Sequence, residues 1–155
     1  MIMGKKRPMA EKWVPSRKDL DRILEVNNEH ELFLVGQVCI ERMLDRILEE
    51  KFGIPFKLDE PIFMWSQKCL VLKFSGYLAG EVKGNVERIG KIRSRYAHRL
   101  NPNEGYIGSL INKLQLIDAP AGVESRARAG TKFEKYRLCV ISTFTALEKI
   151  FEKID

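Results

Sequence analysis

The chain has 155 residues, of which 45% are hydrophobic and 31% charged, so it is long enough and apolar enough for one globular domain and does not suit a disordered or fibrous protein. Lysine and arginine number 27 against 21 aspartates and glutamates, which gives a net charge of 27 − 21 = +6 and permits, without requiring, a polyanionic partner. The longest apolar runs, such as residues 62–65 and 69–72, fall far short of the roughly 18–20 residues of a membrane span, which excludes an integral membrane protein.

Residues 1–15 are predicted to form a flexible basic arm ahead of a single helical domain of residues 16–155. Six basic side chains stand against one acid within residues 1–18, and two prolines discourage regular structure there. Because no apolar stretch follows the first charges, the arm is not a secretory signal, and we expect a cytoplasmic protein. A basic tail can be merely solvated; the candidate nucleic-acid contacts in this one are Lys5, Lys6 and Arg7.

Two helices are predicted in the first third of the domain. Ser16 is a candidate N-cap for a helix that ends near residues 27–28. A longer helix follows over residues 29–52 and stops at Gly53, and its apolar residues recur at spacings of three and four, which predicts one buried face. Acidic residues at intervals of four on its polar face are interpreted as a solvated stripe and not as a metal site: Glu41, Asp45 and Glu49.

A third helix is predicted to open at Asp59 and Pro61, because proline suits the first helical turn, and to be broken by Gly80 and Gly84. Between residues 62 and 79, twelve of eighteen residues are apolar. Apolar side chains all around a helix imply contacts on several sides. We therefore expect this helix to be the central element.

Three further helices complete a predicted all-α fold, a bundle of five to six helices. The fourth runs from about residue 85 to residue 100 and ends before Pro102, and a short helix lies around residues 106–116. The last begins after Thr131, which forms a capping box with Glu134.

The sequence gives no motif for a cofactor or a metal ion, and none is expected. A stretch from Gly84 to Lys91 departs from the phosphate-binding loop in its glycine spacing and lacks the following serine or threonine. The cysteines are odd in number, far apart and set among aliphatic residues, so we expect reduced, buried thiols at Cys39, Cys69 and Cys139.

The fourth helix concentrates the residues that carry chemistry. A helical wheel places His98 opposite an apolar arc, with Ser94 one turn before it and Arg93 at the edge of that arc. Histidine moves protons near neutral pH and guanidinium groups pair with phosphate, so together they can cleave RNA without a metal ion. Alternatively, these cations only favour the helix C-terminus through its dipole. The candidate nucleic-acid contacts on this helix are Arg88, Lys91, Arg95 and Arg99.

The segment Ile92-Arg93-Ser94-Arg95-Tyr96-Ala97-His98 resembles the Ile-Arg-Asn-x-Phe-Ala-His segment of the mannitol-operon repressor family, within the HEPN (higher eukaryote and prokaryote nucleotide-binding) superfamily. Residues 40–44 resemble the glutamate-bearing long helix of that family, and residues 65–69 and 76–78 its aromatic–lysine and Gly-Leu elements. The resemblance covers roughly residues 31–100. It departs from the family at Ser94, where asparagine is usual.

The resemblance implies an antiparallel helical bundle that forms a homodimer, whose Arg and His pairs meet across the interface. Active HEPN members are metal-independent endoribonucleases; by resemblance, Arg93 would grip the phosphate and His98 would transfer protons, with Ser94 and Tyr96 in support. The wheel also places Gly90 and His98 away from the intrachain core, which leaves a face for a twofold contact.

Two functions therefore stay open, beside a nucleotide-binding or antitoxin-like role. One is a HEPN-like RNA-binding domain with endoribonuclease activity, its partner RNA or, alternatively, DNA. The other is a non-enzymatic transcriptional regulator or scaffold, similar to the mannitol-operon repressor, that acts through contacts with a partner protein.

Overall fold

The computed structural model describes residues 17–54, 64–97, 104–117 and 130–154. Within these ranges the chain forms helices and no strand, which confirms the predicted all-α fold. The predicted arm of residues 1–15, with Lys5, Lys6 and Arg7, lies outside them. None of the described helices is both long and apolar enough to cross a membrane. The helices are α1 (Arg17–Glu25), α2 (Glu29–Phe52), α3 (Trp65–Phe74), α4 (Gly80–Ala97), α5 (Glu104–Asn112) and α7 (Lys132–Glu152).

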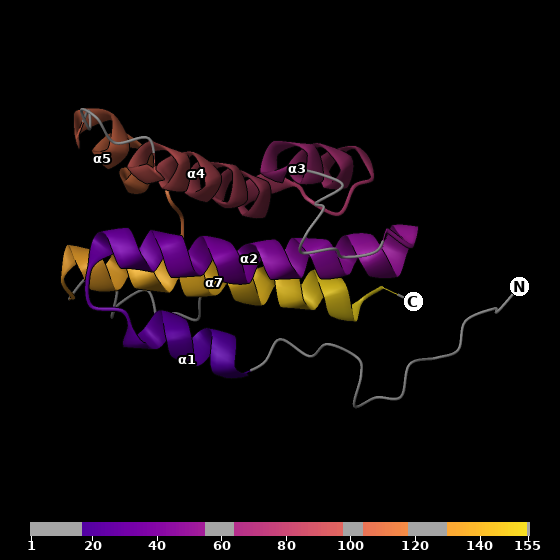
Figure 1. Cartoon of the computed structure of the whole chain (residues 1–155), viewed down its shortest axis with the longest axis horizontal. Helices are drawn as coiled ribbons and strands as arrows, with labels where there is room; N and C mark the ends of the chain where they lie inside the picture. Colours follow the sequence, from indigo (N-terminus) through magenta and orange to yellow (C-terminus); the bar gives the residue numbers. More distant parts are fainter. Residues whose placement is uncertain (1–16, 55–63, 98–103, 118–129, 155) are drawn as a thin grey trace, which may run out of the picture.

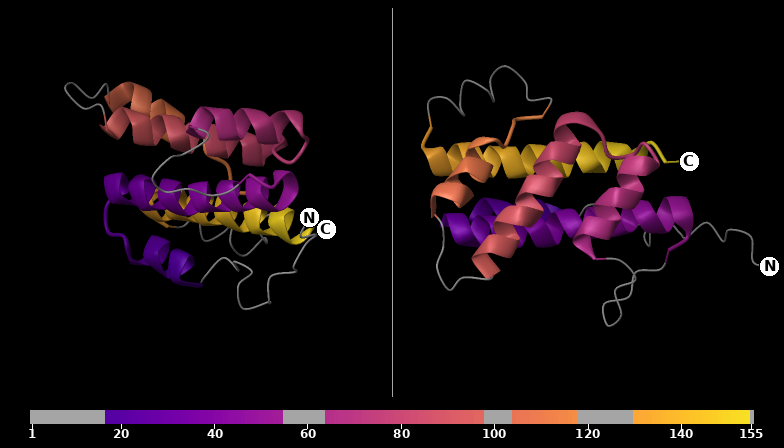
Figure 2. Two further views of the ribbon diagram at one scale, coloured as in Figure 1. Left: turned by 45° about the vertical axis from the view of Figure 1, so that its right-hand side comes forward. Right: turned by 90° about the horizontal axis from the view of Figure 1, so that it is seen from above.

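The helices are arranged in three layers (Figure 1). α2 and α7 lie side by side in the middle, α1 covers one side of them, and α3, α4 and α5 lie on the other. α1 and α4 run antiparallel to α2, whereas α7 runs in the same direction as α2. Seen from above, α4 crosses the α2–α7 pair obliquely (Figure 2).

α2 has the bounds that the sequence predicted. The Asn28 side chain accepts a hydrogen bond from the Glu31 amide at 2.8 Å and so caps its start. At its end, Gly53 adopts the left-handed conformation, with φ of 65°. α2 packs against α1, α3, α4 and α7, which makes it the central element of the fold.

The prediction of a central third helix is wrong. Its predicted opening at Asp59 and Pro61 lies outside the described residues; Met64 is extended, and its amide donates to the Gln67 side chain at 2.8 Å where α3 begins. α3 ends at Phe74, before Gly76 turns the chain with φ of 84°. The apolar run led to a wrong prediction because several of its residues are exposed and not packed against other helices. Met64 is 72% exposed, Leu70 51% and Phe74 78%.

α4 begins at Gly80, five residues before the predicted start, so Gly84 lies inside a helix and breaks none. A fully buried amide, that of Asn85, fixes its position. The Asn85 Nδ2 donates to the Gln115 carbonyl at 2.7 Å and to Thr143 Oγ1 at 3.0 Å, while its Oδ1 accepts from the Gln115 amide at 3.0 Å. These bonds tie α4 to α7 and to the segment after α5, and they satisfy the buried polar group.

α7 holds α1 in place. Thr131 Oγ1 accepts from the Glu134 amide at 3.2 Å, as the predicted cap requires. One turn into the helix, the guanidinium of Arg137 donates to the carbonyls of Leu24 at 3.0 Å and Val26 at 2.6 Å. Because the last carbonyls of a helix have no partner within it, Arg137 satisfies the C-terminal end of α1.

Candidate functional site

α4 carries most of the predicted site residues, and its buried face agrees with the helical wheel. Val86, Ile89, Ile92 and Tyr96 are buried in the core, whereas Lys91, Ser94 and Arg95 are exposed. Arg93 lies at the boundary between the two faces and is half-buried. His98, Arg99 and Leu100 lie outside the described residues.

The guanidinium of Arg93 has no partner among the described residues. Neither a hydrogen bond nor an ion pair joins its guanidinium to another residue of the described ranges, and its Nε is buried without a hydrogen-bond partner. A half-buried arginine that forms no ion pair with the described residues is available to bind an anion.

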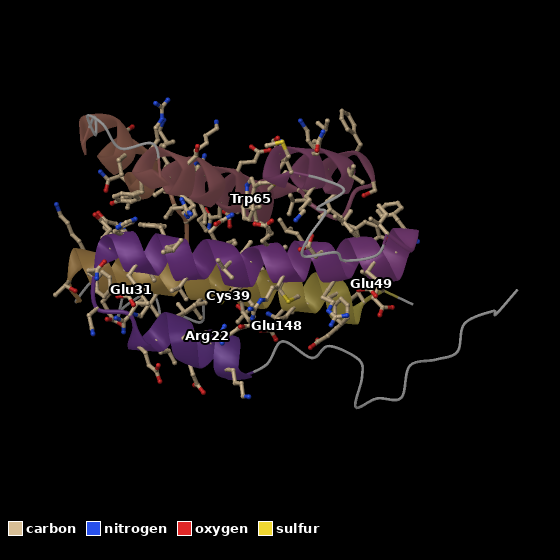
Figure 3. All side chains as sticks on the ribbon, viewed as in Figure 1. Arg22, Glu31, Cys39, Glu49, Trp65 and Glu148 are labelled. Carbon is tan, nitrogen blue, oxygen red and sulfur yellow. The ribbon has the colours of Figure 1, made fainter. Side chains whose placement is uncertain are left out.

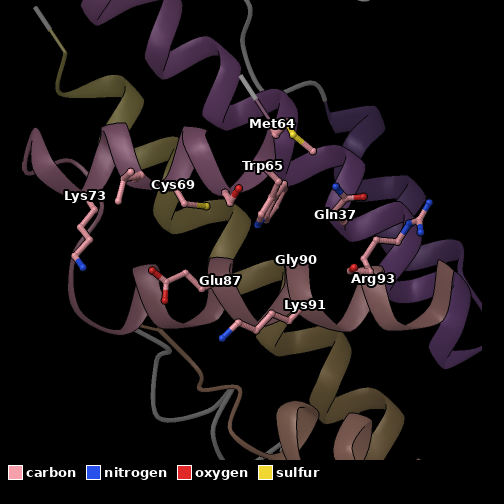
Figure 4. Close-up of a pocket in the computed structure, with 12 residues that line it drawn as sticks. Gln37, Met64, Trp65, Cys69, Lys73, Glu87, Gly90, Lys91 and Arg93 are labelled. Atoms are coloured by element: carbon pink, nitrogen blue, oxygen red, sulfur yellow. The ribbon is translucent and has the colours of Figure 1, made fainter. Parts of the chain in front are cut away.

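Arg93 lines a pocket of about 640 Å³ between α3 and α4, with one wall from α2 (Figure 4). This volume lies within the range of small-molecule sites. Figure 4 places Gln37 and Arg93 toward one end of the pocket and Lys73 toward the other, with Trp65 between them. The remaining lining residues are Met64, Ser66, Cys69, Leu70, Glu87, Gly90, Lys91 and Ser94.

The pocket therefore brings together three predicted site residues, Lys91, Arg93 and Ser94, with residues that the sequence did not single out for the site. Of its charged groups, Lys73, Lys91 and Arg93 are cationic and Glu87 is anionic, so the local balance is 3 − 1 = +2. No sequence pattern could have placed Gln37 of α2 or Lys73 of α3 here, because only the crossing of three helices makes them neighbours.

Gly90 shapes the floor of this pocket. A β-carbon built on Gly90 would overlap Nε1 and the adjoining ring atoms of Trp65, so the indole lies directly against the α4 backbone. Trp65 thus lies where α3 meets α4, in the layer above α2 in the view of Figure 3. The expectation that Gly90 faces away from the intrachain core is wrong, because the wheel did not take α3 into account.

A buried ion cluster joins α3 to α2 beside the pocket. The Lys68 Nζ lies 2.8 Å from Asp45 Oδ1 and 2.8 Å from Glu41 Oε1, and Gln37 Nε2 donates to Glu41 Oε2 at 2.9 Å. Burial acts to lower the pKa of Lys68, but its hydrogen bonds to Asp45 and Glu41 outweigh that effect and raise it. Lys68 is therefore held as a cation between the two carboxylates.

The cluster corrects the interpretation of the acidic stripe on α2. Asp45 is buried and Glu41 is partly buried, both as partners of Lys68, and Glu49 pairs with Arg46 at 3.2 Å. The sequence held a signal for this cluster. Lys68 is the one charged residue within the apolar run of residues 62–72, and a charged residue in such a run needs a partner of opposite charge when it is buried.

Tyr96 lies on the core side of α4, and the pocket does not include it. Its hydroxyl donates to Glu29 Oε2 at 3.2 Å, and its ring centroid lies 4.7 Å from that of His30. Tyr96 therefore joins the last turn of α4 to the first turn of α2. Arg88, also outside the pocket, donates to the Lys113 carbonyl at 3.1 Å.

Within the described ranges, no three histidine, cysteine, aspartate or glutamate side chains gather into a set that could hold a metal ion. The three cysteines are buried and free, as predicted. Burial raises the pKa of Cys39 and of Cys69 to about 12 and that of Cys139 to about 11, so all three thiols stay protonated and unreactive.

Comparison with known proteins finds no matching family model, no similar curated protein and no similar solved structure.

Proposed function

We propose that this chain is an RNA-binding domain in which Arg93 holds a phosphate of the strand. The observation that carries the proposal is the guanidinium of Arg93, which lines a pocket and has no ion-pair partner among the described residues. Guanidinium binds phosphate through two parallel hydrogen bonds. A guanidinium that forms no ion pair with a carboxylate is available for such a contact.

The surrounding charge supports a polyanionic partner. Lys73 and Lys91 line the same pocket as Arg93, and the whole chain has a net charge of +6. Phosphate contacts of this kind supply most of the sequence-independent affinity for nucleic acid. RNA is preferred to DNA in this proposal because of the resemblance to HEPN domains.

The proposed activity is RNA cleavage without a metal ion. His98 would accept the proton of a 2′-hydroxyl, whose oxygen attacks the adjacent phosphorus while the bond to the 5′-oxygen breaks. That oxygen takes up the proton held by the imidazolium, so the products are a 2′,3′-cyclic phosphate and a 5′-hydroxyl end and the imidazole is neutral again. Arg93 would stabilise the negative charge that develops on the phosphoryl oxygens. A homodimer, in which two such pairs meet, is part of the proposal.

Binding tests the first step. Replacing Arg93 by alanine should weaken binding of a single-stranded RNA about tenfold, because a hydrogen-bonded charge contact is lost. The slope of the logarithm of affinity against the logarithm of salt concentration should fall by about 0.7 for one lost phosphate contact. Arg22→Ala, in α1 on the opposite side of the fold, removes the same charge and should leave affinity nearly unchanged. Equal losses in the two variants would contradict a phosphate site at Arg93.

Cleavage tests the second step. Incubation of mixed RNA with the protein in EDTA should yield fragments ending in 2′,3′-cyclic phosphate. His98→Ala should abolish these fragments while RNA affinity and melting temperature stay near the parent values. Intact RNA over a broad range of protein concentration and pH would remove the nuclease activity from the proposal and leave the RNA-binding domain.

A second candidate is a non-enzymatic regulator or scaffold that acts through protein contacts, as the resemblance to the mannitol-operon repressor also implies. It is favoured by the three exposed apolar side chains at α3, Met64, Leu70 and Phe74, because exposed apolar groups that gather on one element are typical of protein-binding surfaces. A protein contact of this kind should persist at high salt, whereas an RNA complex should weaken steeply.

A further inference from the structure

We propose that the pocket between α3 and α4 binds a single nucleobase of the RNA strand, next to the phosphate assigned to Arg93. The inference rests on the proposed function and adds to it a base-binding subsite, made by α3 side chains that no sequence motif assigned to the site.

The apolar part of the pocket fits a planar ring. Trp65, Met64, Cys69 and Leu70 line it from the α3 side, and the Gly90 backbone closes the floor beneath the indole. Leu70 is half exposed and Met64 more so, although each lines a concave surface where a bound ring would cover it. Single-stranded nucleic acid is commonly bound by such a combination of aromatic or apolar contacts to bases and a cationic track for the backbone.

The cationic part lies within the same pocket. Lys91 and Arg93 contribute from α4 and Lys73 from α3, and the carboxylate of Glu87 opposes them only in part. An apolar ligand would leave these cations without a partner, and a simple anion would leave the apolar wall exposed to water. A nucleotide satisfies both parts, because it joins a planar base to a phosphate within one residue of the strand.

The test compares two RNA strands of equal charge. One is an oligoadenylate of about ten nucleotides, and the other is a strand of the same length whose riboses carry no base. In fluorescence-anisotropy titrations, the parent protein should bind the oligoadenylate about tenfold more tightly than the abasic strand, since each base contact adds to the phosphate contacts.

Variants locate the base. Leu70→Ser should bring affinity for the oligoadenylate close to that for the abasic strand and leave affinity for the abasic strand unchanged. Leu24→Ser is the matched control, because Leu24 of α1 is also 51% exposed. Phe74→Ser is a second control on α3 itself, since Phe74 lies outside the pocket lining. Met64→Ser should repeat the effect of Leu70→Ser, which keeps the test valid should Leu70→Ser alter the melting temperature.

Each contrary outcome is distinct. Equal binding of both strands, with affinity lost in Arg93→Ala, would overturn the base subsite and leave the proposed function standing. A base-dependent affinity that Leu70→Ser and Met64→Ser do not change would overturn its location in this pocket. A changed oligomeric state of Leu70→Ser without a change in RNA affinity would assign the surface to protein contact and also overturn the inference. If neither strand binds, the proposed function itself fails.

Discussion

The indole of Trp65 lies directly against the backbone of Gly90, so the contact between α3 and α4 depends on the absence of a side chain at position 90. Glycine normally weakens a helix interior by about 1 kcal/mol relative to alanine. At this position glycine leaves room for the indole, which a β-carbon would overlap.

Replacing Gly90 by alanine should therefore destabilise the protein. The added methyl group forces the indole of Trp65 away from α4, and overpacking of this kind costs about 1–3 kcal/mol in the free energy of unfolding. Urea-induced unfolding followed by circular dichroism measures the change.

Gly108→Ala is the matched control for this substitution. Gly108 lies inside α5, and a β-carbon there meets no atom within 4 Å. Its replacement should leave stability unchanged or raise it by up to about 1 kcal/mol. If Gly90→Ala were as stable as Gly108→Ala, the close contact between α3 and α4 would be refuted.

Lys68→Met should be strongly destabilising near neutral pH. The substitution leaves the carboxylates of Asp45 and Glu41 partly buried without a cation, which costs about 3 kcal/mol or more in the free energy of unfolding. Burial raises the pKa of Asp45, so this carboxyl group takes up a proton as the pH falls toward about 4, and the difference between variant and parent should shrink.

The control for Lys68→Met removes the uncompensated charges. Combining it with Glu41→Gln and Asp45→Asn should restore part of the lost stability at pH 7, because a neutral amide is less costly to bury than an unpaired carboxylate. A triple variant less stable than Lys68→Met alone would show that the cluster acts by packing and not by charge.

Glu148 gives a prediction about pH dependence. Burial, with a smaller effect from Glu152, raises the pKa of Glu148 above its ordinary value, and its Oε1 is buried without a hydrogen-bond partner. A carboxyl group whose pKa is raised on folding stabilises the protein below its unfolded pKa of about 4.3, and that stabilisation is lost as the pH rises through the folded pKa. Glu148→Gln should therefore raise the melting temperature at pH 7 and have little effect near pH 4.

The control is Glu50→Gln, at an exposed position of α2, which should leave the melting temperature nearly unchanged at pH 7 and at pH 4. If Glu50→Gln raised the melting temperature at pH 7 as much as Glu148→Gln, the effect would come from net charge and not from burial.

The sequence predicted those features of the fold that depend on interactions between residues a few positions apart in the chain. The bounds of α2 follow from Asn28 and Gly53, and the buried face of α4 follows from the three- and four-residue spacing of Val86, Ile89 and Ile92. Each of these signals lies within one helix, where capping and periodicity act over a few residues.

The features that the sequence did not predict depend on how helices cross. Composition suggested that α3 is central, but Phe74 is 78% exposed because no helix of the described ranges covers its side chain. Lys68 pairs with Glu41, which lies 27 residues earlier in the chain. Trp65 packs against Gly90, which lies 90 − 65 = 25 residues later. Contacts between residues so far apart leave no periodic pattern in the sequence, so only the folded structure reveals the pocket.

Tyr96 separates a structural role from a role in the proposed chemistry. The sequence placed it in support of the RNA site, whereas in the fold its hydroxyl donates to Glu29 and the pocket does not include it. Tyr96→Phe should lower the free energy of unfolding by about 1 kcal/mol through loss of this hydrogen bond and leave RNA affinity and cleavage unchanged. Glu29→Gln keeps an acceptor for the hydroxyl and should cost less stability than Tyr96→Phe. Parallel unfolding and RNA-cleavage measurements decide between the two roles, because a Tyr96→Phe variant with full stability and reduced cleavage would place the hydroxyl at the reacting phosphate.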